Sequence, residues 1–137
     1  MQRIDIPASA EAPELELLDL DFDGTADIRV IDVRPAGPNV TYVNWLYDQA
    51  SGQFVRSAAL DALVAPQFDA VRREVRSSWR DGATRYGMEI YTFRAGRLEP
   101  LARETREYSE PGVYTLKRLR WADGTWQLIE TVQGRGD

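Results

Sequence analysis

The stretch Val113–Val132 reads VYTLKRLRWADGTWQLIETV and carries the strongest fold signal in the chain. Two runs with many β-branched, aromatic and other apolar residues, 113–121 and 126–132, flank the pair Asp123-Gly124. An Asp-Gly pair between such runs is typical of a two-residue β-hairpin turn, because both central residues of that turn adopt positive φ. We therefore expect two antiparallel strands that meet at this turn.

Similar runs recur along the chain, separated by Gly, Pro, Asn and Asp at the roughly eight- to twelve-residue spacing of β-sandwiches and barrels. One short helix is expected at residues 57–63, ended by Pro66, and Pro100 suggests that its strand lies at a sheet edge. Trp121 and Trp126 are expected to form a cross-strand pair. The expected strands are residues 2–6, 14–18, 28–33, 41–47, 53–55, 71–79, 85–93, 98–108, 113–121 and 126–132. At 71–79 the four-residue spacing of Val71, Val75 and Trp79 also allows a helix, and the strand is favoured. The prediction is an all-β fold, a mostly antiparallel β-sandwich or barrel.

Length and composition limit the classes of protein that the chain can belong to. Its 137 residues predict a single β domain over 1–137, with 1–13 as a flexible N-terminal segment and 133–137 as a flexible tail. The formal charge of -5 argues against a nucleic-acid partner, which needs a basic surface. The absence of Cys and His excludes thiol nucleophiles, His-based triads and the usual zinc sites. No membrane span is predicted from the sequence.

An acidic loop precedes the run at 28–33 and reads DLDFDGTAD over residues 19–27. Calcium binds six to eight oxygen ligands, and loops of the D-x-D-x-D-G type supply them from alternating positions around a sharp glycine turn. Gly24 stands at the turn position. Without a cation, carboxylates packed so closely raise each other's pKa. The predicted calcium ligands are Asp19, Asp21, Asp23, Thr25 and Asp27.

This loop differs from an EF-hand, because Val30 stands where the EF-hand has its bidentate Glu. Asp27 must therefore close the site, alone or with Asp32. The flanking segments alternate or are β-branched, which favours a calcium loop between two strands and a structural ion over a catalytic one. The alternative is an acidic turn that binds no metal.

A second group of candidate residues lies at 77–87, where small residues at a bend are flanked by Arg and Tyr. Tyr and Arg are favoured interface anchors, because each combines contact area with hydrogen-bond donors. The alternative is an ordinary hairpin in which Trp79 and Tyr86 face the core. Glu104, Glu107 and Glu110 are the best candidates for an enzyme's acid and base, but a solvated strand face explains them more simply. The protein is therefore expected not to be an enzyme.

The order of several motifs resembles a bacterial envelope family over roughly residues 14–93. The motifs are the acidic loop, Gly37-Pro38-Asn39 followed by Tyr42 and Trp45-Leu46-Tyr47, then Phe54, Leu60, Pro66 and Phe68-Asp69. Described members of that family are calcium-binding periplasmic immunity proteins, which protect cells from peptidoglycan hydrolases delivered by bacteria-killing type IV secretion systems. Their fold is similar to that of periplasmic inhibitors of invertebrate-type lysozymes.

The resemblance implies an inhibitor that occludes the active site of a lysozyme-like hydrolase toxin. In such inhibitors a Ser-Gly-x-x-x-Tyr loop inserts into the enzyme cleft; residues 82–86 are similar, but Asp81 replaces the Ser and Ser78 lies farther upstream. Arg85 and Tyr86 are therefore the strongest candidates. The predicted partner-binding residues are Ser78, Arg80, Gly82, Ala83, Thr84, Arg85 and Tyr86.

Two further expectations concern the setting of the protein. Free calcium is scarce in the cytosol, so a calcium site favours the periplasm, with a leader or lipoprotein signal removed. The alternative function is a calcium-dependent binding or adhesion module without an enzyme target.

Overall fold

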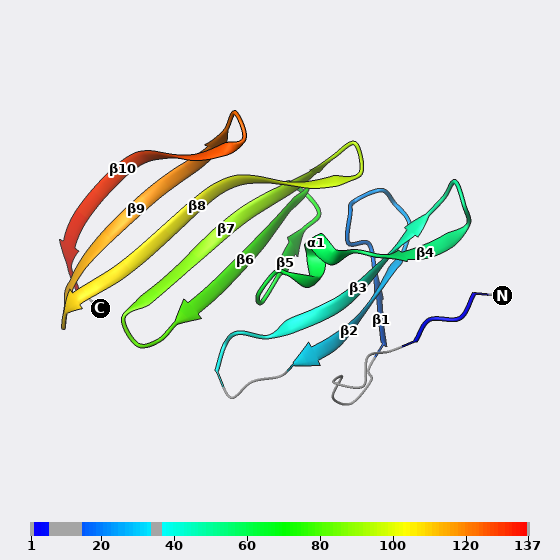
Figure 1. Cartoon of the computed structure of the whole chain (residues 1–137), viewed down its shortest axis with the longest axis horizontal. Coiled ribbons are helices and arrows are strands. Elements are labelled where there is room, and N and C mark those ends of the chain that lie inside the picture. Colours follow the sequence, from blue (N-terminus) through cyan, green and yellow to red (C-terminus); the bar gives the residue numbers. More distant parts are fainter. Residues whose placement is uncertain (1, 6–14, 34–36, 137) are drawn as a thin grey trace.

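The computed structural model describes residues 2–5, 15–33 and 37–136, which form two open antiparallel sheets (Figure 1). The first sheet has the order β1-β2-β3-β4, with β1 Leu15–Leu18, β2 Asp27–Val33, β3 Thr41–Asp48 and β4 Gln53–Arg56. The second has the order β10-β9-β8-β7-β6-β5, with β5 Gln67–Asp69, β6 Glu74–Asp81, β7 Arg85–Arg94, β8 Arg97–Glu110, β9 Val113–Ala122 and β10 Thr125–Arg135. The all-β prediction is confirmed. Neither sheet closes on itself, so the fold is consistent with a β-sandwich and not with a barrel.

The hairpin between β9 and β10 forms as the sequence predicts. Asp123 and Gly124 have φ of 52° and 74°, both in the left-handed region that this two-residue turn requires. Trp121 lies opposite Trp126, and their ring centroids are 5.2 Å apart in an edge-on arrangement. The predicted cross-strand aromatic pair is therefore confirmed.

The two sheets meet around a small apolar core beside α1 (Ala58–Asp61). Its buried members are Leu20, Leu60, Leu63 and Val75. The Ser57 hydroxyl accepts a hydrogen bond from the Leu60 backbone N–H and caps the helix, which confirms the predicted short helix. Figure 1 shows that β9 and β10 lie far from the first sheet, so within the described ranges no strand of that sheet covers this end of the second sheet. No helix in the described part of the chain is long and apolar enough to cross a membrane.

The first sheet has a second apolar cluster, formed by Ile28, Val30, Val43 and Trp45. Ile4 packs against this cluster, and the Gln2 side chain both donates to the Phe54 carbonyl and accepts from the Phe54 N–H. The predicted strand at 2–6 is wrong for residues 2–5, which have no strand structure; Ile6 lies outside the described residues. The side-chain amide of Gln2 attaches residues 2–5 to β4, in place of the backbone hydrogen bonds of a paired strand.

Two predicted boundaries also change. β6 begins at Glu74 and not at residue 71, because the Asp69 carboxylate accepts the backbone N–H groups of Val71 and Arg72 and forms a turn there. β10 continues to Arg135 and pairs with the start of β9, so three residues of the expected flexible tail belong to the strand.

Pro100 does not mark an edge strand as predicted, since β8 lies inside the six-stranded sheet. The register between β7 and β8 shifts at this point, with Ile90 opposite Ala102 and Tyr91 opposite Pro100. The pairing of β8 with β9 begins only at Ala102. Pro100 is therefore tolerated next to a bulge and beyond the reach of β9.

Candidate functional site

The acidic loop joins β1 to β2 and brings four carboxylates together. One oxygen from each of Asp19, Asp21, Asp23 and Asp27 lies within 4.8 Å of the others. Gly24, at the predicted turn position, has a φ of 87°, which a residue without a side chain adopts at little cost. The structure thus brings together all four aspartates that the sequence singled out.

Asp27 attaches the loop to the first sheet. It is fully buried, and its two carboxylate oxygens accept the backbone N–H groups of Leu20 and Tyr47, each at 2.8 Å. Tyr47 belongs to β3, so one side chain connects the loop to a strand that is distant in sequence. A buried carboxylate with two such bonds is held in one orientation, which suits a fixed ligand.

Asp19 and Asp23 shape the turn itself. The Asp19 carboxylate accepts the backbone N–H of Asp23 at 3.2 Å and that of Gly24 at 2.8 Å. The Asp23 carboxylate accepts the backbone N–H of Thr25 at 2.9 Å. These bonds orient both carboxylates before any ion arrives, which lowers the entropy that binding would cost.

The electrostatics of the loop favour a cation. Burial, followed by the nearby charge of Asp27, raises the pKa of Asp21 from 3.8 to about 7. Burial also raises the pKa of Asp27, against the two backbone hydrogen bonds that lower it. Asp21 Oδ1 is buried and has no hydrogen-bond partner. An all-oxygen donor set with an orphaned buried oxygen fits a hard divalent cation.

Two other predicted contributors have different positions. The Thr25 hydroxyl accepts a hydrogen bond from Gln49 Nε2 at 2.8 Å, in the turn after β3. Asp32 is five residues along β2 from Asp27, a span of ~16 Å at ~3.3 Å per residue, and is not part of the carboxylate cluster. Of the two ways of closing the loop, Asp27 alone is the one that the structure allows.

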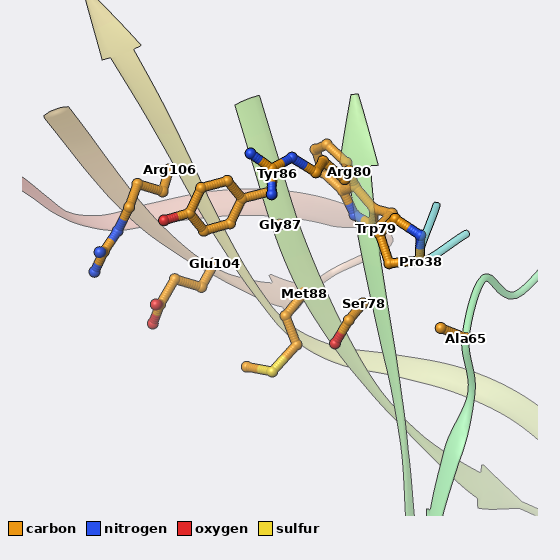
Figure 2. Close-up of a pocket in the computed structure, with 10 residues that line it drawn as sticks. All are labelled: Pro38, Ala65, Ser78, Trp79, Arg80, Tyr86, Gly87, Met88, Glu104 and Arg106. Carbon is orange, nitrogen blue, oxygen red and sulfur yellow. The ribbon is translucent and has the colours of Figure 1, made fainter. Parts of the chain in front are cut away.

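The β6–β7 hairpin contains the predicted partner-binding residues. Arg80 lies directly opposite Tyr86 and Ser78 opposite Met88, so these side chains share one face of the sheet. They line a hollow of about 480 Å³ (Figure 2). Gly82 turns the chain with a φ of 80°. The Arg80 guanidinium donates to the carbonyls of Gly82 at 3.1 Å and Ala83 at 3.4 Å, which stiffens the turn.

Arg85 lies on the opposite face from Tyr86, because successive residues of a strand alternate. Its guanidinium is 3.6 Å from the Asp81 carboxylate and 5.4 Å from the centre of the Trp79 ring. The two strongest sequence candidates therefore point to different sides of the hairpin. The Trp79 indole N–H donates to the Glu89 carboxylate at 2.7 Å. Neither Trp79 nor Tyr86 belongs to the two apolar clusters.

Sequence reasoning missed the two residues, Arg106 and Tyr108, that β8 places beside the hairpin. Arg106 lies opposite Tyr86, and the hydroxyls of Tyr86 and Tyr108 are 3.4 Å apart. Tyr108 in turn lies opposite Tyr114. The residue types were visible in the sequence, but only the strand register places them next to Tyr86. A second hollow of about 570 Å³ lies here, between Thr84, Tyr86 and the β8–β9 turn.

The glutamates considered as an acid and a base do not form a pair. Glu104 points to the same face as Arg106 and contacts Arg118 at 3.2 Å, whereas Glu107 alternates to the other face. Glu104 is thus paired with an arginine, and Glu107 and Glu110 are exposed.

Comparisons with known proteins point to the fold. No protein-family model matches the chain, and no curated protein matches it in sequence. A solved structure of a Xanthomonas protein described as related to the type IV secretion system superposes with a TM-score of 0.70 and 21% identity. The match covers 85% of this chain and 57% of that protein, so the chain spans little more than half of its length. At this identity the similarity shows a common fold.

Proposed function

We propose that this protein is an inhibitor, or immunity protein, that occludes the active site of a lysozyme-like peptidoglycan hydrolase in the periplasm and is stabilised by a structural calcium ion. The observation that carries the proposal is the stiff β6–β7 hairpin, which presents Tyr86 and Arg80 between two hollows at one end of an uncovered sheet. The fold shared with a protein related to type IV secretion supports a role in that setting.

Calcium would have a structural role in this proposal. The loop that would hold it reaches the second sheet, because the Arg73 guanidinium donates to the Phe22 carbonyl at 3.0 Å. The Phe22 ring lies 6.4 Å from that of Phe68 and 6.2 Å from that of Phe93. A bound calcium ion would neutralise the four carboxylates and remove their mutual repulsion next to these contacts between the loop and the second sheet. The ion would thereby stabilise the contact between the two sheets on which the hairpin depends.

The hairpin suits the cleft of a glycan hydrolase. Such a cleft carries paired carboxylates and walls that stack on sugar rings. The guanidinium of an arginine pairs with such carboxylates, and the phenol ring of a tyrosine packs on such walls. An inserted hairpin held by its own hydrogen bonds would block substrate without any chemical step, which agrees with the expectation that the protein is not an enzyme.

The test is peptidoglycan lysis by a panel of lysozymes and lysozyme-like toxins, including any encoded beside this protein, with and without the inhibitor. We expect Tyr86→Ala to weaken inhibition of the sensitive enzyme by at least about tenfold, as for an interface anchor. Arg97→Ala, at the exposed first residue of β8 beside the β7–β8 turn and at the other end of the sheet, is the matched control. Inhibition of no enzyme in the panel would contradict the proposal and favour a calcium-dependent binding module.

A further inference from the structure

A band of alternating Arg and Tyr side chains crosses four strands beside the β6–β7 turn. Arg80 of β6 lies opposite Tyr86 of β7, which lies opposite Arg106 of β8. Tyr108, two residues after Arg106, lies opposite Tyr114 of β9. All five side chains share one face, since residues two apart on a strand point the same way. We name these five residues the Arg-Tyr strip.

The strip is held together by its own contacts. The Arg80 guanidinium lies 5.8 Å from the centre of the Tyr86 ring, and that of Arg106 lies 4.3 Å from the centre of the Tyr114 ring. Figure 2 shows Tyr86 between Arg80 and Arg106, with its phenol oxygen directed towards Arg106. The rings of Tyr108 and Tyr114 are 5.6 Å apart. A surface ordered in this way loses little side-chain entropy on binding.

Gly134 of β10 lies opposite Tyr114 and supports its ring. A Cβ added at this position would come within 2.5 Å of the Tyr114 ring, so the ring lies directly on the glycine backbone. Any side chain here would push Tyr114 out of place. The neighbouring rings of Tyr108 and Tyr114 meet edge-on at 62°.

The charge of the strip is not compensated within the described part of the chain. No carboxylate there forms an ion pair with Arg80 or Arg106, whereas Arg118, on the same face, contacts Glu104 at 3.2 Å and Glu130 at 2.8 Å. Arg80 uses its guanidinium on the carbonyls of its own turn. The phenols of Tyr108 and Tyr86 beside Arg106 raise the pKa of its guanidinium. Arg106 therefore keeps a full positive charge on a protein whose net charge is -5.

We infer that the Arg-Tyr strip extends the inhibitory surface beyond the hairpin, and that Arg106 anchors it by pairing with a carboxylate in the cleft of the hydrolase. This inference rests on the proposed function and specifies one contact between the inhibitor and the hydrolase. The guanidinium fork accepts a carboxylate with two parallel hydrogen bonds, and a dry interface strengthens that pair. The hollows on either side, of about 480 and 570 Å³, leave room for the rims of the cleft.

Charge favours this occupant over others. On an acidic protein, a basic and aromatic band attracts an acidic, sugar-binding cleft, whereas a nucleic acid would be repelled by the net negative charge of the whole protein. The tyrosines supply the flat apolar area that sugar-stacking walls accept. Hairpin and strip would then contact the same cleft, the turn entering it and the strip closing over its edge.

The experiment measures the dissociation constant for the hydrolase that the protein inhibits, using wild type, Arg106→Gln, Arg106→Lys and Arg120→Gln. Arg120 is the matched control, because it is exposed on the same face of β9 and forms no ion pair with the described residues. We expect Arg106→Gln to weaken binding by at least about tenfold, Arg106→Lys to weaken it less, and Arg120→Gln to leave it unchanged within about twofold. Melting temperatures measured in parallel should agree among the four proteins.

A partner variant makes the readout specific. Replacing the catalytic Glu of the hydrolase by Gln should weaken binding of wild type and add little to the loss seen with Arg106→Gln, since the two changes remove one contact. If wild type inhibits a hydrolase and Arg106→Gln binds it as tightly, the strip inference is overturned and the proposed function stands. If wild type inhibits no hydrolase, both are overturned.

Discussion

Replacing the buried carboxylate of Asp27 by an amide, in Asp27→Asn, tests how the acidic loop is attached to the fold. Asp27 is fully buried and accepts one backbone N–H on each oxygen, from Leu20 and from Tyr47. An asparagine of the same shape can accept only one of these hydrogen bonds. Its amide nitrogen would face the other N–H, leaving two buried donors that point at each other.

The expected cost follows from these two bonds. A hydrogen bond to a charged group contributes ~1.5–3 kcal/mol, and a buried donor left without a partner costs ~1–3 kcal/mol. Without calcium, part of this loss is offset, because the substitution removes repulsion from Asp21 and the burial of a charge. The net expectation is ~2–4 kcal/mol of lost stability in chelator, or a melting temperature lower by about 6–15 °C for a domain of this size.

The assay is urea unfolding followed by tryptophan fluorescence, since the buried ring of Trp45 reports on the first sheet. It is run in chelator and in calcium for wild type, Asp27→Asn and Asp23→Asn. Asp23 is the matched control, because it is exposed and accepts only the local Thr25 N–H. In chelator, Asp23→Asn should therefore change stability by less than ~1 kcal/mol, yet it should reduce the stabilisation that calcium gives.

Two results would refute this reasoning. Equal stability of Asp27→Asn and wild type in chelator would mean that the carboxylate does not anchor the loop to β3. A calcium-induced shift in Asp23→Asn as large as in wild type would mean that Asp23 is not a ligand. The absence of any calcium shift in wild type would leave the acidic turn without a metal.

The remaining predictions concern protonation and packing. In chelator, the contribution of Asp21 to stability should fall as pH rises from about 4 to about 7, because over this range the folded state holds a proton on Asp21, whose pKa is raised from 3.8 to about 7, and the unfolded state does not. The full shift corresponds to ~4 kcal/mol, which solvent screening at this partly exposed loop reduces to ~1–2 kcal/mol; a fall equally steep in Asp21→Asn would contradict the assignment. Gly87→Ala should cost ~1–3 kcal/mol, since its Cβ would meet the Trp79 ring at 2.4 Å, whereas Gly37→Ala has nothing within 4 Å and should be neutral in the same thermal melts.

Elements with local causes could be predicted from the chain alone. The Asp123-Gly124 turn, the capped helix at Ser57 and the acidic loop depend on residues within a few positions of one another, so their patterns could be recognised from the sequence. The strand alternation then predicted an antiparallel fold, and the structure confirmed it.

Which residues come together on one surface depends on how the strands pair in the folded protein. Arg85 and Tyr86 are neighbours in sequence but lie on opposite faces, and Arg106, twenty residues away, shares the face of Tyr86. In the same way, Tyr47 holds Asp27 through a backbone N–H that no sequence pattern marks. The physical reason is that strand register decides which residues are neighbours, and register depends on bulges and on the packing of the whole sheet. The candidate ligands were therefore recognisable in the chain, while the surface that would meet a partner exists only in the folded sheet.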